Sequence, residues 1–241
     1  MKITKFLLVL VFLTGCITVY NPATDRKEHY FFSEETEVSW GKAVADRFVQ
    51  TNEMSKGQQA ISYLERVGAK VAQQSHRNNL QYHFYLIDKN EINAFAVFGG
   101  HIFVYQGLLD KVSEDELAFV LGHELGHICA RHSLKRLQAS LGFAILTGIL
   151  LRSPDLASAQ SLSSEVFNMV SLGYSRKDEL QADSLGLQYT IKAGYDSAAV
   201  ISLFEMLQKE SKGAASIPFY LRSHPYPEQR IENIKKEIEK I

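Results

Sequence analysis

SEDELAFVLGHELGHIC, residues 113 to 129, carries the start signal of a helix. Ser113 followed three positions later by Glu116 matches a capping box, and the acidic first turn suits the positive end of the helix dipole. Apolar residues then recur at three- and four-residue spacing, and no proline interrupts them. We therefore predict one uninterrupted helix from Ser113 to about Leu137, with the pentapeptide HELGH well inside it.

The pentapeptide places two histidines, His123 and His127, on one face of this helix. Both imidazoles can then hold one metal ion while the carboxylate of Glu124 addresses a water molecule, as in zinc hydrolases. The pattern is short enough to arise by chance, and two histidines in the core of a buried helix are the alternative. Gly122 and Gly126 each cost about 1 kcal/mol relative to alanine inside a helix. Their position beside the histidines predicts a closely packed neighbouring element.

A catalytic zinc site takes three protein ligands, so one more must come from elsewhere. His132 lies nine positions after His123, about 180° round a continuous helix, and we do not expect it to be a ligand. The metzincin spacing would require a histidine at position 133, where this chain has Ser133. The third ligand is therefore expected downstream.

A second helical pattern runs from Tyr174 to Gly194 and carries Glu179 and Asp183 on one face. In isolation, two carboxylates on a helix face are most simply solvated. Beside a HExxH motif, a glutamate that ligates zinc and an aspartate that accepts the other N–H of a ligating imidazole would complete and orient the site. We predict these roles for Glu179 and Asp183.

The combination of HExxH at 123 to 127 with ExxxD at 179 to 183 resembles the zinc-binding core of the gluzincin metallopeptidases. That family includes HtpX, the CAAX prenyl proteases, the Oma-type proteases and the bacterial BepA and LoiP proteins. Further matching segments are NAFA at 93 to 96, GGHIFV at 99 to 104, and Ser223-His224-Pro225 with Pro227 and Arg230. The similarity spans residues 30 to 235, and the architecture resembles most the short lipoprotein members of the LoiP type.

The resemblance implies an α+β, mainly helical zincin-like metalloprotease domain with a small β-sheet next to the HExxH helix. It implies one Zn2+ per chain and an endopeptidase that cleaves misfolded or mis-assembled cell-envelope proteins through a metal-activated water, with Glu124 moving the proton. His224 resembles the family's C-terminal histidine near the metal. It would donate to the oxyanion or take the fourth zinc position as a reversible latch, unless it is only a turn residue.

Two other functions stay open from the sequence. One is a chaperone-like outer-membrane assembly factor whose zinc site is latched, and the other is a non-catalytic lipoprotein with a structural zinc. The intact Glu124 argues against the structural site, which needs no base. For a substrate, we expect the strand edge near residues 99 to 104 to accept an extended peptide, with His101 at the surface.

The composition fits a single globular domain and argues against nucleic acid as a partner. The 241 residues are 46% hydrophobic, enough for the core of one domain, and 26 basic against 27 acidic residues give no electrostatic footprint for nucleic acid. Cys129, on the motif helix, is expected to be a small buried core residue rather than a redox sensor.

The first sixteen residues predict export. Lys2 and Lys5 precede an apolar run too short to span a membrane, and Leu13-Thr14-Gly15-Cys16 resembles the bacterial lipobox. We predict a signal peptide at 1–15, lipidated Cys16 and a tether at 16–30, and a zinc metallopeptidase domain at 31–241. An ordinary secretory signal is the alternative. The lipid would hold the protein to the membrane, at the periplasmic face of the outer membrane, with outer-membrane assembly machinery as a partner and no nucleic acid.

The remaining elements follow from periodicity. We predict helices at 34–50 and 57–75, strands at 80–87 and 94–104, a core helix at 141–151, a segment at 152–164 that could form a flap, and helices after residue 196.

Overall fold

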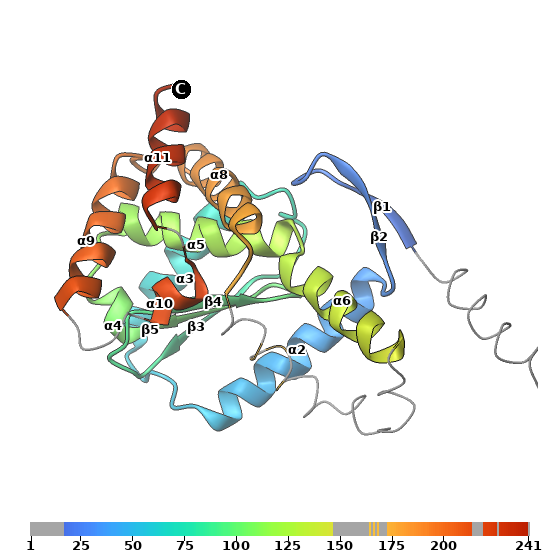
Figure 1. The fold of residues 1–241 in the computed structure, drawn as a ribbon. Coiled ribbons are helices and arrows are strands. Elements are labelled where there is room, and N and C mark those ends of the chain that lie inside the picture. The colour runs from blue at the N-terminus through green and yellow to red at the C-terminus, as the bar shows by residue number, and fades with distance from the viewer. Residues whose placement is uncertain are drawn as a thin grey trace, which may run out of the picture.

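The structure is a computed structural model and describes residues 17–146, 164, 166, 168, 173–213, 219–225 and 227–240. The predicted signal peptide, Cys16 and nearly all of the 152–164 segment lie outside these residues. The elements are β1 (Ile17–Asn21), β2 (Arg26–Tyr30), α2 (Glu34–Thr51), α3 (Gln58–Ala72), β3 (His83–Ile87), β4 (Ala94–Val97), β5 (His101–Tyr105), α4 (Gln106–Leu109), α5 (Glu114–Cys129), α6 (His132–Leu146), α8 (Arg176–Lys192), α9 (Ala199–Gly213), α10 (Phe219–Ser223) and α11 (Pro227–Ile238) (Figure 1). Among the described helices, none has the length and apolar character needed to cross a membrane.

Helix α5, which carries the HELGH pentapeptide, lies at the centre of the molecule. It starts at the predicted capping box: Glu116 N donates to Ser113 Oγ (3.3 Å), and Ser113 N donates to Glu116 Oε2 (2.8 Å). Every residue from Leu117 to Cys129 is buried, including the free thiol of Cys129. The central helix therefore packs on all sides rather than along one stripe.

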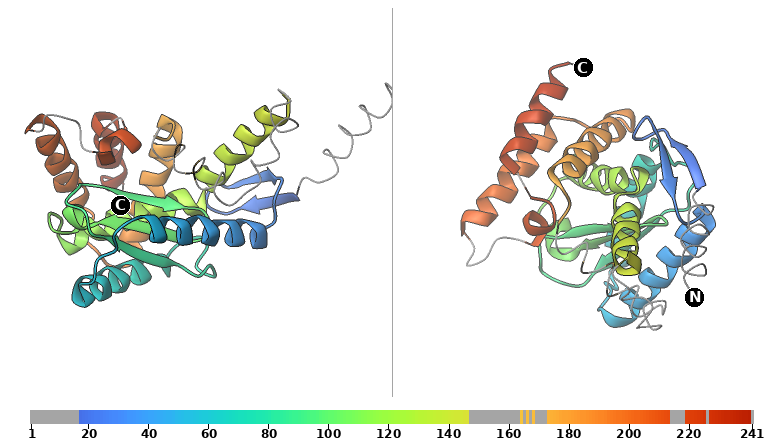
Figure 2. Two further views of the ribbon diagram at one scale, coloured as in Figure 1. Left: turned by 90° about the horizontal axis from the view of Figure 1, so that it is seen from below. Right: turned by 45° about the vertical axis from the view of Figure 1, so that its right-hand side comes forward.

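A three-stranded mixed sheet lies next to α5, as the resemblance implied. Its order is β3-β5-β4, with β5 parallel to β3 and antiparallel to β4. Ala96 and Ile102 belong to the core shared with α3 and α5, whereas Phe95 and Phe103 stack on each other and contact Phe48 of α2. Helix α2 thus covers the face opposite α5, below the sheet in Figure 1 and in front of it in the left view of Figure 2. Because helices cover both faces of the sheet, all residues of β4 and β5 are buried.

The prediction of one uninterrupted helix to Leu137 is wrong, because the chain breaks at Arg131. Arg131 has φ +55°, a left-handed conformation that costs an L-residue about 1–2 kcal/mol, and α6 begins at the next residue. Its guanidinium is held by Glu34 (2.8 Å) and Glu37 (3.0 Å) of α2 and lies 4.6 Å from the centroid of the Tyr30 ring. These contacts come from distant sequence, so local periodicity could not reveal the break.

Residues predicted as a polar tether include a β-hairpin. β1 and β2 pair antiparallel, and the hairpin is fixed to the helices by Asn21 Nδ2, which donates to the carbonyl of Cys129 (3.0 Å), and by Lys135, which bonds to Glu28 (2.5 Å). Tyr30 is buried, while the first four residues of β1 are exposed. The hairpin is therefore anchored to the helices at its buried residues and exposed to solvent along most of β1.

Helices α5 and α8 touch through glycines, as Gly122 and Gly126 predicted. A β-carbon at Gly126 would lie 2.8 Å from the carbonyl oxygen of Ala182, and one at Gly122 would lie 2.8 Å from that of Gly186. Only hydrogen side chains allow the two backbones this approach. The close contact brings the first turn of α8 against the histidine face of α5.

Candidate metal site and catalytic centre

The two motif histidines point into one buried site. His123 and His127 are at most 1% exposed, and their Nε2 atoms lie 3.0 Å apart. The one-turn spacing on α5 produces this convergence, as the sequence predicted.

Helix α8 adds two carboxylates. Ser175 caps the helix by accepting from Asp178 N, which places Glu179 in the first turn facing α5. Glu179 Oε1 lies 3.4 Å from His127 Nε2, and its Oε2 lies 3.5 Å from His123 Nε2. One turn later, Asp183 Oδ1 lies 2.8 Å from His123 Nδ1, on the far side of that ring. The structure thus brings Glu179 to the histidine nitrogens and Asp183 behind one of them.

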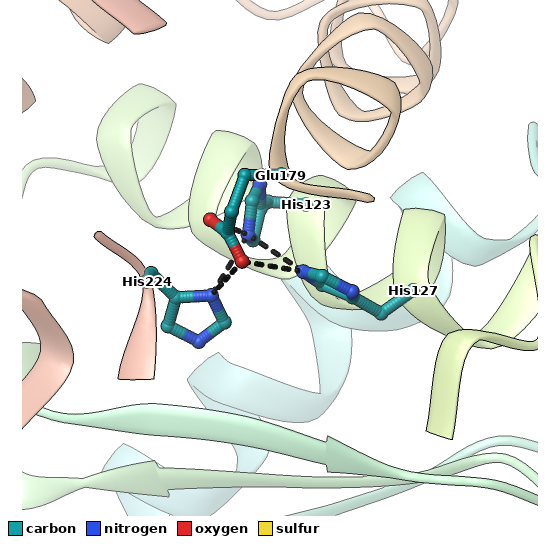
Figure 3. A group of neighbouring side chains, drawn as sticks. All are labelled: His123, His127, Glu179 and His224. Atoms are coloured by element: carbon teal, nitrogen blue, oxygen red, sulfur yellow. Dashed lines mark hydrogen bonds and ion pairs between the residues drawn. The ribbon is translucent and has the colours of Figure 1, made fainter. Parts of the chain in front are cut away.

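His224 enters the same cluster from the turn between α10 and α11. Its Nδ1 lies 3.1 Å from both His123 Nε2 and Glu179 Oε1 (Figure 3). His224 is fully buried, and its backbone N–H donates to the carbonyl of Tyr220. The turn therefore aims this imidazole at the other three side chains.

His123, His127, Glu179 and His224 each offer one atom to a group whose members all lie within 4.8 Å of one another. The five distances between these side chains given above, 3.0 to 3.5 Å, compare with roughly 3.3 Å between the ligand atoms of a tetrahedral zinc at bonds of about 2.0–2.1 Å. Three imidazole nitrogens and one carboxylate oxygen are also ligand types that zinc prefers. These residues therefore fit a metal ion.

Glu124 lies beside the cluster without a hydrogen-bond partner. Within the described residues, both of its carboxylate oxygens and His224 Nε2 are buried and accept or donate no hydrogen bond, although Glu124 Oε1 and His224 Nε2 approach to 3.4 Å. The hydroxyl of Tyr220, whose ring lies 4.6 Å from that of His224, is also unpaired there. Buried polar groups are rarely left unpaired without a functional reason. No motif or periodicity in the sequence points to Tyr220.

The two glutamates have opposite pKa shifts. Burial raises the pKa of Glu124, and the nearby His224 and His123 offset only part of that effect. Burial alone would also raise the pKa of Glu179, but His224 and Arg230 hold it well below its ordinary value. Environments that separate two carboxyl groups in this way distinguish a proton carrier from a permanently charged group.

Arg230 supports the site from α11. Its guanidinium bonds to both oxygens of Asp183 (2.7 Å each), lies 2.9 Å from Glu179 Oε2 and donates to the carbonyl of His224 (3.1 Å). The side chain is 1% exposed. Its Nη2 also lies 3.2 Å from His123 Nδ1, so one buried cation contacts four of the site residues. From the sequence, Arg230 was identified only as part of a segment that resembles the family, and no role was predicted for it.

Two residues behind His127 were also missed. His132, which is outside the cluster as expected, has its Nδ1 2.9 Å from His127 Nδ1. The Tyr174 ring stacks on that of His127, with centroids 3.9 Å apart. The break at Arg131 turns His132 toward the site, and that break has no local sequence signal.

Two expectations about the sheet are wrong. β5 pairs on both sides, so residues 101–105 offer no free edge to a peptide, and the edge strand next to α5 is β4. His101 is 3% exposed rather than at the surface, and Tyr85 Oη lies 3.1 Å from its Nδ1. Aromatic and β-branched residues alone do not reveal which strand is central.

Known proteins resemble this chain over the same region. The model of peptidase family M48 matches residues 58–238, which include all four members of the cluster. The beta-barrel assembly-enhancing protease of Escherichia coli is 29% identical over 72% of this chain and 38% of that protein. The mitochondrial metalloendopeptidase OMA1 of Arabidopsis thaliana is 32% identical over 81% and 38%. Metalloprotease YcaL of Escherichia coli is 28% identical over 99% and 98%.

The chain thus spans only 38% of the length of two of these relatives. Its resemblance to gluzincins nevertheless extends from the HExxH helix through Glu179 to the segment of His224, and the family model covers this whole region. The chain belongs to peptidase family M48.

Proposed function

We propose that the chain is a zinc-dependent endopeptidase that cleaves misfolded or mis-assembled proteins of the cell envelope. The observation that carries the proposal is the convergence of His123, His127 and Glu179 beside the carboxylate of Glu124, which accepts no hydrogen bond from the described residues. A zinc ion bound by these three residues would supply an acidified water and polarise a peptide carbonyl. The envelope substrate class is supported by the name of two relatives, beta-barrel assembly-enhancing protease.

The side chains divide the remaining work. Glu124, with its raised pKa and no competing hydrogen bond, accepts a proton from the attacking water and delivers it to the leaving amine. Asp183 accepts from His123 Nδ1, which leaves Nε2 of that ring free of a proton on the cluster side. Arg230 keeps Asp183 and Glu179 charged in a buried setting.

The test compares Glu124→Gln with the unchanged chain. We expect cleavage of casein to fall at least about 100-fold, the usual contribution of a general base, while zinc content by mass spectrometry stays at one per chain. His123→Ala is the matched control and should lose both activity and zinc. Full activity of Glu124→Gln would refute the assigned role.

The position of His224 favours a second candidate, the latched assembly factor. Its Nδ1 lies 3.1 Å from His123 Nε2 and from Glu179 Oε1, and the four members of the cluster lie within 4.8 Å of one another, so His224 is within reach of the fourth position of a tetrahedral shell. In that state the fourth position is closed to substrate. His224→Ala should then increase casein cleavage; if His224 instead donates to the oxyanion, the same variant should lose activity while it retains zinc.

Attachment to the outer membrane through Cys16 is a further part of the proposal. Cys16 lies outside the described residues, but the exposed apolar side chains of Ile17, Val19 and Tyr20 follow it directly. Such residues suit a membrane surface. Mass spectrometry of the full chain from membranes should find the acyl groups at Cys16, and Cys16→Ser should shift the protein to the soluble periplasmic fraction.

A further inference from the structure

His132 forms a buried connection behind one of the site histidines. Its Nδ1 lies 2.9 Å from His127 Nδ1, and its Nε2 lies 3.1 Å from Gln181 Oε1. His132 is 2% exposed, so both contacts are shielded from water. His127 is therefore held from the side opposite to the cluster.

The protons in this connection can be assigned from the partners. Gln181 Oε1 can only accept, and Asp178 Oδ1, 3.5 Å from the same nitrogen, is a second acceptor on that side. The proton of a neutral His132 therefore resides on Nε2, which makes its Nδ1 an acceptor. His127 must then donate from Nδ1, and its Nε2 keeps a lone pair toward the cluster.

We propose that His132 is a positioning residue that fixes the tautomer and the ring orientation of His127 for metal binding. The arrangement parallels that of His123, whose Nδ1 faces Asp183. The two acceptors differ in charge: Asp183 is a carboxylate paired with Arg230, whereas His132 faces no arginine in the described contacts. Each of the two motif histidines thus has its own hydrogen-bond acceptor behind it, as is usual for ligating histidines.

The break after α5 creates this contact. On a continuous helix, His132 would lie on the opposite side from His123, whereas the left-handed Arg131 turns it back toward His127. The ion pairs of Arg131 with Glu34 and Glu37 hold that turn. The network on α2 therefore determines where His132 points.

A stacked aromatic ring limits the remaining freedom of His127. The rings of Tyr174 and His127 are inclined by 25° at a centroid distance of 3.9 Å, and Tyr174 Oη lies 2.7 Å from Ser133 Oγ. Tyr174 constrains the plane of His127, and His132 constrains rotation within that plane.

The test is zinc affinity, measured on the full chain by competition with a chromophoric chelator. It rests on the proposed zinc site but does not depend on proteolysis. We expect His132→Leu to weaken zinc binding about 10- to 100-fold, and His132→Gln, which can still accept a hydrogen bond, to recover most of the loss. His101→Leu is the matched control, because it also removes a buried histidine with an Nδ1 contact, to Tyr85 on the sheet, and it should bind zinc as the unchanged chain does.

Nitrogen-15 NMR of His127 supplies an independent readout, because it reports the tautomer in metal-free protein as well. The unchanged chain should show a protonated Nδ1, and His132→Leu should show a mixture. Should His132→Leu fail to fold, Gln181→Leu removes the closer of the two acceptors of His132 Nε2 from a half-buried position and should shift the tautomer of His127 in the same direction. Unchanged zinc affinity and tautomer in a folded His132→Leu would overturn the inference. Absence of zinc binding in the unchanged chain would instead refute the proposed function.

Discussion

Among the arginine–carboxylate pairs of the described residues, that of Arg230 is buried and that of Arg66 is exposed. Arg230 and its partner Asp183 are at most 1% exposed, whereas Arg66 and Glu114 are 56% and 39% exposed. The geometry of the two pairs is similar, with shortest N···O distances of 2.7 Å in both. Their difference in burial isolates the effect of solvent on such a contact.

We predict that Arg230→Met destabilises the chain severely, by about 3–5 kcal/mol, because it leaves Asp183 and Glu179 buried without their counter-charge. Arg66→Met should cost less than about 1 kcal/mol, since water and salt already screen that pair. Urea denaturation of both variants measures the difference. If both variants lost the same free energy of unfolding, the buried carboxylates of Asp183 and Glu179 would not need the charge of Arg230.

At the residue scale, the sequence predicted those site members whose relation is local. His123 and His127 share a helix turn, and the ExxxD spacing joins Glu179 to Asp183 in the same way. The contacts of Arg230 with Asp183 span 47 positions and depend on how α11 packs against α8. No periodicity encodes such a contact, so the role of Arg230 emerged only from the structure.

At the element scale, the contact between α5 and α8 depends on the absence of side chains. We predict that Gly126→Ala lowers the free energy of unfolding by about 1–3 kcal/mol, because the methyl group would collide with the backbone of Ala182 and outweigh the better helix propensity of alanine. Zinc affinity should fall as well, since α8 carries Glu179. Thermal unfolding with and without zinc measures both effects.

Gly57→Ala is the control, because its methyl group would meet only ordinary contacts, at 3.5 Å and beyond. It should cost less than about 1 kcal/mol, the scale of an altered helix cap. If Gly126→Ala lowered the free energy of unfolding no more than this control does, the close approach of α5 and α8 would not require glycine at position 126.

The hairpin contact should depend on pH. Burial alone would raise the pKa of Glu28, but hydrogen bonds from Lys135, Tyr30 and Asn21 lower it below its ordinary value of 4.5. A carboxyl group with a lowered pKa stabilises the fold fully above that ordinary value and loses this effect as the pH falls through the lowered pKa.

We therefore expect Glu28→Gln to destabilise the chain at pH 7 and to differ progressively less from the unchanged chain as the pH drops below 4.5. Urea denaturation at a series of pH values measures the gap. A gap that stayed constant down to pH 3 would mean that the charge of Glu28 does not hold the hairpin.

The elements themselves were predictable to different degrees. The capping box fixed the start of α5, because both of its hydrogen bonds are local. The end of that helix was not predictable, since Arg131 adopts its left-handed conformation through ion pairs with α2, 97 positions away in the case of Glu34. The β1–β2 hairpin was missed for a similar reason, because Asn21 is fixed by a carbonyl 108 positions away.

At the scale of the whole molecule, the metal site should contribute to overall stability. Its candidate ligands come from α5, α8 and the turn before α11, so a bound ion would connect three segments of the fold. We predict that EDTA lowers the melting temperature by roughly 10 °C and that added zinc restores it, as expected when a ligand binds only the folded state at about 1,000 times its Kd.

Glu124→Gln should show the same shift, because Glu124 is not a member of the ligand cluster. His127→Ala should show none. If EDTA left the melting temperature of the unchanged chain the same, the metal would make no contribution to the stability of the fold.

The separation of the ligands along the chain has a consequence for biosynthesis. His224 follows His123 by 101 positions, and Glu179 lies between them. The HExxH helix therefore emerges and can form long before the residues that complete the site, and the unfolded chain holds no assembled metal cluster. A nascent molecule would thus be harmless to its neighbours, and proteolysis would begin only after the fold itself has closed.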